Sequence, residues 1–359
     1  MVTRSRLCRV HVEPSGCPAR PLRRGKVRIF VEGPWWCGEW TAISVATLEQ
    51  LGHKVAFHYH NRRTLTDRIA LAAGKLARPA ESRNAAWTRR YQPKLFEAMH
   101  GAGWDALLSI QGRVQADTVH RLRRHSPGLR VMYWWGDIIT DQASRRIAEA
   151  AEFSNRILVS YRGAYDKLRT VYGDKIVYFP FGVSPRFHQV RELTRRDRQR
   201  YTAEVALVGT CYPERCELVR HLNARLAKPV RVWGRGWRHC RGVQAHGPLP
   251  LADTLKVYAC SRISLNLHHP DTDNGCNMKF FEIPAAGGFQ ICDWQAVLEK
   301  TALGMQTVSC RSPADFADKI SHFLACAKER KCIAERTAAM AYANETYLTR
   351  FGKLMERLA

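Results

Sequence analysis

The stretch RISLNLHHPDTDNGCNMKFFEIPAAGGFQICDW, residues 262–294, contains the pattern that decides the fold. It begins with an apolar, β-branched run typical of a buried strand, passes through a polar, turn-rich loop, and continues as a helix over 277–286. Two glycines end that helix, and FQICDW (289–294) then has the pattern of another strand. Strand, helix and strand in this order predict a βαβ unit of a parallel sheet.

The same alternation occurs along both halves of the chain, with an arginine-rich stretch, RELTRRDRQR (191–200), between them. The other expected strands are 26–33, 54–60, 104–110, 129–137, 156–160 and 175–187 in the first half, and 203–210, 229–237 and 262–269 in the second. We therefore expect an α/β protein of two Rossmann-like, doubly wound domains that face each other across a cleft, followed by C-terminal helices. In such sheets ligands bind beyond the carboxyl ends of the strands.

The expected division of the chain has five parts. They are a disordered basic tail (1–25), an N-terminal domain (26–182), a basic linker (183–200), a C-terminal domain (201–340) and a terminal helix that packs back on the N-terminal domain (341–359).

The chain has 359 residues and a formal net charge of +25. This excess favours polyanionic partners, namely nucleotide phosphates, nucleic acid or an anionic membrane surface, although solvated basic faces would give the same charge. No apolar run reaches the roughly 20 residues of a membrane helix, and the first 25 residues have no apolar signal segment. We expect a cytoplasmic protein without a transmembrane segment.

The 12 cysteines include no CxxC pair and are expected to be reduced, buried thiols. The sequence HHPD (268–271) resembles a metal-binding cluster, but adjacent histidines point apart on a helix or a strand, so we expect no metal there.

The common phosphate and nucleophile motifs are absent from the sequence. It has no GxxxxGK[ST] and no GxSxG, and its one GxG after an expected strand, Gly234 to Gly236, has His239 in place of the third glycine. A dinucleotide-dependent dehydrogenase is therefore disfavoured.

The helix at 277–286 places Lys279 and Glu282 in an otherwise apolar run. Gly275 precedes this helix, whose N-terminus offers free N–H groups and the positive end of a dipole to a diphosphate. Lys279 would add positive charge, and Glu282 on the same face could accept two hydroxyl hydrogen bonds, as from a ribose. The alternative is an ordinary surface pair, which leaves the surrounding apolar residues unexplained. Pro284 predicts a short or kinked helix.

Several motifs resemble those of one protein family. In the second half these are VALVGTCYPER, VRVWGRGW, HGPLPLADTLKVYACSRISLNLH, NGCNMKFFEIPAAGGFQICD and YLTRF, and in the first half FVEGPWWCGEW, WWGD, SYRGAYDKL and YFPFGVSPRFH. In this order they resemble GT-B fold glycosyltransferases of the spore maturation protein B (CgeB)-like branch, with a group 1-type donor-binding domain. The resemblance covers roughly residues 26–350.

The resemblance implies a site for a nucleotide-diphosphate sugar. Glu282 matches the ribose-binding second Glu of the family's E-x7-E element, and Lys279 matches a basic position near the diphosphate. The first Glu falls at Asn274, a departure from the retaining pattern that leaves the stereochemical outcome open. The implied donor-binding residues are Gly209, Gly236, Trp237, Gly247, Asn274, Gly275, Asn277, Lys279 and Glu282.

The N-terminal half is expected to bind the acceptor. The loop GPWWCGEW would cover the cleft, with glycines that give access to the backbone and tryptophans that offer flat surfaces to a sugar. The residues so implied are Gly33, Trp35, Trp36 and Gly38. Glu39 and Asp137 follow expected strands, and one of them would act as the catalytic base if the enzyme inverts. A helix cap or a first-turn charge is the alternative for each.

Together these features predict a metal-independent glycosyltransferase, of hexosyl or related groups, that uses a nucleotide-diphosphate sugar as co-substrate and needs no other cofactor. The DTD at 271–273 lies in a loop rather than after a strand, so we expect no metal at the diphosphate. The acceptor hydroxyl belongs to an unidentified saccharide, glycan, small molecule or polyanion. A catalytically idle protein that binds a nucleotide sugar or a polyanion such as nucleic acid is the alternative.

Overall fold

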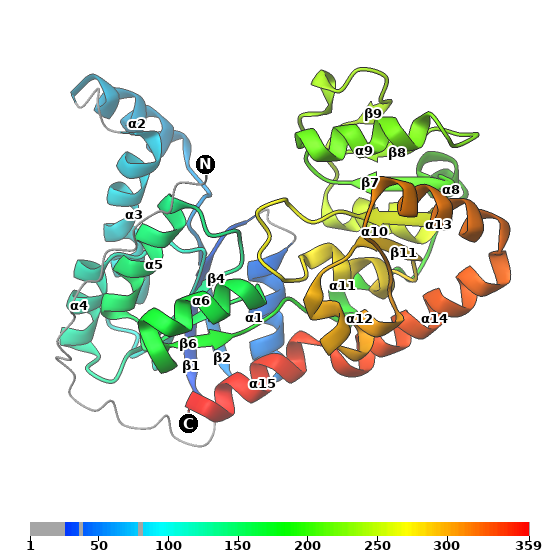
Figure 1. Ribbon diagram of the computed structural model, residues 1–359. Coiled ribbons are helices and arrows are strands. Elements are labelled where there is room, and N and C mark those ends of the chain that lie inside the picture. The colour runs from blue at the N-terminus through cyan, green and yellow to red at the C-terminus, as the bar shows by residue number, and fades with distance from the viewer. Residues whose placement is uncertain (1–25, 36–38, 78–81, 359) are drawn as a thin grey trace.

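The computed structural model describes residues 26–35, 39–77 and 82–358, and it consists of two parallel sheets with helices on both faces (Figure 1). The first sheet has the order β2-β1-β3-β4-β5-β6, and the second has the order β12-β11-β10-β7-β8-β9. The first comprises β1 Arg28–Gly33, β2 Lys54–Tyr59, β3 Ala106–Ile110, β4 Arg130–Trp135, β5 Arg156–Val159 and β6 Ile176–Tyr178. The second comprises β7 Val205–Val208, β8 Arg231–Trp233, β9 Ala245–His246, β10 Ile263–Asn266, β11 Gln290–Asp293 and β12 Val308–Cys310.

Helices connect successive strands in each half, as expected for two doubly wound units. Those of the first half are α1 Trp40–Gln50, α2 Leu65–Ala77, α3 Arg83–Met99, α4 Ala116–His125, α5 Asp141–Phe153 and α6 Arg162–Tyr172. Those that follow are α7 Pro185–His188, α8 Arg195–Tyr201, α9 Pro213–Asn223, α10 Leu251–Cys260, α11 Met278–Ala285, α12 Ala302–Gln306, α13 Pro313–Ala325, α14 Ala327–Asn344 and α15 Tyr347–Leu358. No helix in the described ranges has the length and apolar character needed to cross a membrane.

The arginine-rich stretch between the halves is partly helical. Thr194 caps α8, because its hydroxyl accepts the Asp197 N–H while the Asp197 carboxylate accepts the Thr194 N–H. This reciprocal cap fixes the start of a seven-residue helix in a segment that composition alone describes as a basic linker.

The end of the chain returns to the N-terminal domain. In Figure 1, α15 leaves the second domain and lies along the first, beside α1. Phe351 of α15 is fully buried, and its ring lies 6.1 Å from Trp134 and 5.1 Å from Phe179 between ring centroids. Arg350 is half-buried; it pairs with Glu345 and donates a hydrogen bond to the carbonyl of Pro180 in the first domain. The last helix thus completes the core of the N-terminal domain.

One expectation about the cysteines is wrong. Cys216 and Cys240 form a disulfide, with Cα atoms 5.7 Å apart, whereas we expected reduced thiols throughout. Cys216 lies in α9 and Cys240 follows the turn after β8, and 24 residues separate them. Sequence spacing gave no sign of the pair because the adjacency of β7 and β8 brings it together.

We expect Phe351→Ala to lower the free energy of unfolding by about 3–5 kcal/mol, because it removes a fully buried ring from the aromatic cluster around Trp134. Lys353→Ala, an exposed position on the same helix, serves as the control and should change stability by less than about 0.5 kcal/mol. Urea unfolding followed by tryptophan fluorescence measures both. Equal effects of the two substitutions would show that α15 is not part of the core.

Candidate functional site

The predicted donor residues gather at the carboxyl edge of the second sheet. Gly209 follows β7, the turn at 234–237 follows β8, and the loop that leads to α11 follows β10. These strands are neighbours in a parallel sheet, so their carboxyl ends meet at one edge.

Two cationic side chains flank the backbone of Gly209. A Cβ built on this glycine would lie 3.0 Å from an Nη atom of Arg215 and 3.2 Å from Nζ of Lys279. Gly209 has a φ of +156°, and its carbonyl accepts a 2.7 Å hydrogen bond from the indole N–H of Trp237. Any side chain here would displace the cations, so the position needs glycine.

Arg215 is held rigidly in place. It is only 6% exposed, and its guanidinium donates hydrogen bonds to the carbonyls of Thr210 and Leu267. Burial lowers the pKa of this guanidinium. Arg215 therefore fastens the loop after β7 to the loop after β10 and keeps a positive charge between them.

The sequence places Lys279 and Glu282 on the same face of α11, and the structure brings the two together. The helix is short, as Pro284 predicts, and Asn277 caps it by accepting the Phe280 N–H at 3.1 Å. The Asn277 amide also donates to Asn266 at the end of β10 (2.9 Å). The cap thus ties the start of the helix to the edge of the sheet.

Glu282 is a buried carboxyl group that makes no hydrogen bond to a described residue. Burial raises its pKa, and the positive charge of Lys279 opposes that rise. The hydroxyl of Tyr258, which is also buried, has no hydrogen-bond partner in the described structure, and the two groups interact electrostatically. Buried polar groups without partners cost stability, so a bound molecule that hydrogen-bonds to them would remove this cost.

A histidine that the sequence did not indicate lies at the same edge. The Nδ1 atom of His268 is 2.8 Å from the Asp293 carboxylate, which also accepts the His268 backbone N–H. The Nε2 atom of His268 is buried without a partner among the described residues. The carboxylate orients this ring, so its free nitrogen is fixed in position.

The loop before α11 contacts the N-terminal domain (Figure 1). The N–H groups of Arg162 and Gly163 donate to the carbonyls of Asn274 and Asp273 (3.1 and 2.9 Å). A Cβ on Gly275 would collide with Tyr161, so this glycine allows the close contact between the domains.

Asn274 has a structural part in that loop. Its backbone is left-handed (φ 45°), and its side-chain oxygen accepts the Val297 N–H at 2.7 Å. The side chain therefore holds the loop against the segment after β11.

The other predicted donor residues lie in two turns of the same edge. Gly236 (φ 81°) begins the turn that carries Trp237, and the buried Trp237 supports the Gly209 carbonyl. Gly247 follows β9, the edge strand, and is exposed with no atom near the position of a Cβ.

The predicted acceptor residues that the structure describes lie at the end of β1 and directly after it. Gly33 ends β1, and a Cβ there would overlap Thr41. Trp35 is 53% exposed, and its backbone N–H donates to Asn61. Trp36 and Gly38 fall outside the described residues, as does the basic tail.

The two predicted bases differ in surroundings. Glu39 is exposed at the start of α1, in left-handed conformation (φ 56°), and makes no cap hydrogen bond. Asp137 is exposed after β4, and its charge adds to the burial that raises the pKa of Tyr161. Since Tyr161 lies under Gly275, Asp137 is on the side of the N-terminal domain that meets the donor loop.

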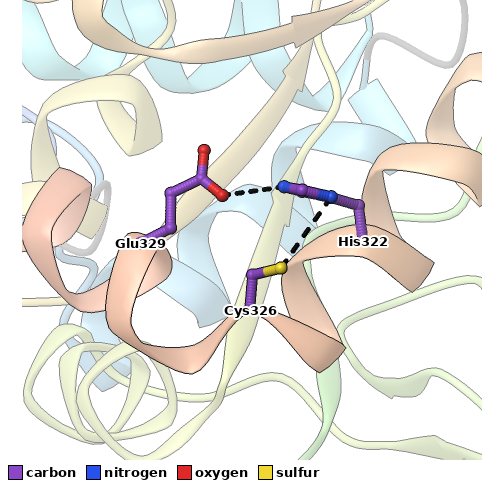
Figure 2. A group of neighbouring side chains, drawn as sticks. All are labelled: His322, Cys326 and Glu329. Carbon is purple, nitrogen blue, oxygen red and sulfur yellow. Dashed lines mark hydrogen bonds and ion pairs between the residues drawn. The ribbon is translucent and has the colours of Figure 1, made fainter.

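Metal-ligating side chains gather elsewhere. Within the described part of the chain, His322, Cys326 and Glu329 bring one ligand atom each to within 4.8 Å of one another (Figure 2). They lie where α13 gives way to α14, and His322 is hydrogen-bonded to Glu329 at 2.8 Å. None of these residues belongs to the edge that carries Lys279 and Glu282, although the group could hold a metal ion.

Sequence reasoning missed Arg215 and Glu32. Arg215 belongs to VALVGTCYPER, and a basic residue one turn into the helix after a glycine-ended strand was a usable signal. Glu32 is buried at the end of β1, where burial raises its pKa to about 7. A single acidic residue in an apolar strand gave no indication of its surroundings.

Comparisons with known proteins agree with this architecture. Residues 214–356 match a family model described as glycosyl transferase-like, and no curated protein matches the chain by sequence. The structure of HepE from Anabaena in complex with UDP-glucose is 12% identical with a TM-score of 0.61, covering 92% of this chain and 99% of that one.

Two further solved structures have the same degree of similarity. A glycosyltransferase from Rickettsia africae is 13% identical with a TM-score of 0.61, covering 93% of this chain and 98% of its own. Sucrose-phosphate synthase from Thermosynechococcus elongatus is 11% identical with a TM-score of 0.61, covering 93% and 99%. The expected GT-B fold, two doubly wound α/β domains, is therefore confirmed.

We expect Glu282→Gln to stabilise the ligand-free protein at pH 8 but not at pH 5. The folded state holds the Glu282 proton to a higher pH than the unfolded state, so the free energy of unfolding falls as pH rises from the ordinary carboxyl range towards neutrality. The neutral amide removes this loss, and the variant should exceed wild type by about 1–3 kcal/mol at pH 8.

Urea unfolding at both pH values measures the difference, and Glu97→Gln, an exposed position on α3, is the control that should show none. A Glu282→Gln difference that is the same at pH 5 and pH 8 would mean that Glu282 is not a buried titrating group.

Proposed function

We propose that this protein is a glycosyltransferase that transfers a sugar from a nucleotide-diphosphate sugar to an acceptor hydroxyl without a metal ion. The observation that carries the proposal is the pair of cationic groups, from Lys279 and Arg215, beside the bare backbone of Gly209. The buried carboxyl of Glu282, which has no hydrogen bond to a described residue, lies three residues beyond Lys279 on the same helix. The family match of residues 214–356 and the shared GT-B fold support this assignment, as does the UDP-glucose bound by HepE.

In this proposal the diphosphate binds at the start of α11. The helix dipole, Lys279 and Arg215 attract its negative charge, and Gly209 lets it approach the backbone. Glu282 then lies one turn further along the helix, where its carboxylate accepts hydrogen bonds from the ribose hydroxyls. Binding in this way gives the buried carboxyl the partners that it lacks in the free protein.

The same groups would promote the reaction. Negative charge develops on the departing diphosphate as the glycosidic bond breaks, and fixed positive charges aimed at that oxygen stabilise the transition state. Arg215 suits this purpose because its two carbonyl partners hold it before the substrate binds. No metal ion is required to neutralise the leaving group.

Asp137 is the carboxylate that we propose as the base for the acceptor hydroxyl. It lies on the side of the N-terminal domain where Tyr161 meets the donor loop. Glu39 has no such link to the second domain among the described contacts. We also propose that the protein belongs to the CgeB-like branch, on the motifs named above.

We expect one sugar nucleotide from a panel of UDP-, GDP-, TDP- and ADP-sugars to raise the melting temperature, because a ligand that binds only the folded state stabilises it by RT ln(1 + [L]/Kd). Glu282→Ala should abolish the shift, and Glu97→Ala should preserve it. A shift that survives in Glu282→Ala would refute the ribose assignment, and no shift with any donor would refute the proposed function.

Turnover of the stabilising donor, measured as release of the nucleoside diphosphate with and without candidate acceptors, separates an enzyme from an idle binding protein. Excess EDTA should leave the rate unchanged, since Lys279 and Arg215 supply the positive charge at the leaving group. Loss of turnover in EDTA that Mg²⁺ or Mn²⁺ restores would contradict metal independence, and binding without turnover would leave only the binding function.

A further inference from the structure

A row of polar side chains crosses the buried first sheet. His58, Glu32, Ser109 and Tyr133 are partners in the register of β2, β1, β3 and β4, so they stand side by side on one face. Parallel sheets covered by helices on both faces are normally apolar throughout. Four polar side chains in a row on one face of this sheet are therefore unusual.

The centre of the row is tightly bonded. The Ser109 hydroxyl and the backbone N–H of Arg113 donate to the fully buried carboxyl of Glu32, at 2.5 and 2.7 Å. A Cβ on Gly112 would overlap both Ser109 and Glu32, so this glycine lets the loop between β3 and α4 lie directly on the row. The row is thus fixed against the start of that loop.

A pocket opens over the Tyr133 end of the row. It has a volume of about 390 Å³ and is lined by Thr88, Gly112, Arg113, Val114, Gln115, Ala116, Asp117, Tyr133, Arg146, Glu149, Ala150, Glu152 and Phe153. We call it the α4–α5 pocket. Tyr133 is only 2% exposed, and it interacts electrostatically with Arg146 and Glu149 of the pocket lining. The pocket is the space from which a ligand could reach the Tyr133 hydroxyl.

The interior of the α4–α5 pocket is cationic. Arg113 and Arg146 are half-buried there, and burial together with the charges of Arg146 and Arg63 lowers the pKa of the Arg113 guanidinium. The Arg113 guanidinium donates to neutral groups among the described residues, chiefly the Thr88 hydroxyl at 2.8 Å, and its Nε atom is buried without a partner in the described chain. The charge of Glu32 opposes the lowering of the Arg113 pKa. Arg146 forms no ion pair or hydrogen bond to a described residue.

The acidic residues of the pocket do not neutralise these charges. Asp117, Glu149 and Glu152 are exposed, and none forms an ion pair with Arg113 or Arg146 in the described structure. Two guanidinium groups that repel each other in one pocket, beside a tyrosine hydroxyl, are arranged to receive an anion, because planar guanidinium groups bind carboxylate and phosphate oxygens in pairs.

We propose that the α4–α5 pocket binds a small molecule through a phosphate or carboxylate group, which pairs with Arg113 and Arg146 and accepts a hydrogen bond from Tyr133. The volume of this half-open pocket suits a metabolite of about monosaccharide size. The site lies in the N-terminal domain and shares no residue with the edge that carries Glu282, so it does not depend on the proposed donor site.

Isothermal titration of the full-length protein with three matched probes tests the proposal: glucose 6-phosphate, glucuronate and glucose. We expect at least one charged probe to bind and glucose to bind far more weakly. Arg146→Gln should lower the affinity for the charged probe by at least about tenfold, and Tyr133→Phe should lower it by about 3- to 10-fold. Arg145→Gln, the neighbouring exposed position on α5, should leave its affinity unchanged.

The two charged probes distinguish a phosphate site from a carboxylate site. Glu282→Ala should bind them as wild type does, so a failure of the donor assignment would not affect this result. The proposal is wrong if neither charged probe binds, if glucose binds as well as they do, or if Arg145→Gln and Arg146→Gln lose the same affinity. Circular dichroism of each variant confirms that a loss reflects the site and not the fold.

Discussion

The packing of Phe351 and Tyr347 on Trp134 attaches the last helix of the chain to the core of the first domain. The last helix, which follows the second domain in the chain, supplies Tyr347 and Phe351 to the core of the first domain. The core of the first domain therefore includes residues from beyond the second domain. The loop before α11 adds a second contact, through Gly275 on Tyr161. With both contacts in place, the carboxyl edge of the second sheet is held beside the first domain.

Glu32 of the first domain and Glu282 of the second are both buried carboxyl groups. Burial raises the pKa of both Glu32 and Glu282, which is unfavourable for a carboxyl group at neutral pH. The two differ in their partners: Glu32 is satisfied by Ser109 and by a backbone N–H, whereas the carboxyl of Glu282 makes no hydrogen bond to any residue that the structure describes. Perturbed groups of this kind concentrate at functional sites, and the unsatisfied one is the better candidate for direct contact with a substrate.

The sequence predicted those features that depend on local spacing. The alternation of apolar strands and helices predicted all strands of the first sheet, and those of the second except β9 and β12. The i,i+3 spacing of Lys279 and Glu282 placed them on one face of a helix that Pro284 keeps short. Features that depend on which strands become neighbours could not be read in the same way. The Cys216–Cys240 disulfide requires β7 to lie beside β8, and the position of Arg215 between two loops requires β7 to lie beside β10.

The polar row of the first sheet depends on strand register, which could not be predicted from the sequence. His58, Glu32, Ser109 and Tyr133 each look like an isolated polar residue in an apolar strand, and their separations in the chain carry no signal. Only the pairing of four strands aligns them, and a shift of one residue in any strand would turn its member to the opposite face. The hydrogen bond from Ser109 to Glu32 stabilises the observed register. Gly112 lets the loop after β3 pack directly on this pair, because any side chain there would clash with it. Local sequence therefore specifies the strands, while these buried polar contacts help to specify how they are aligned.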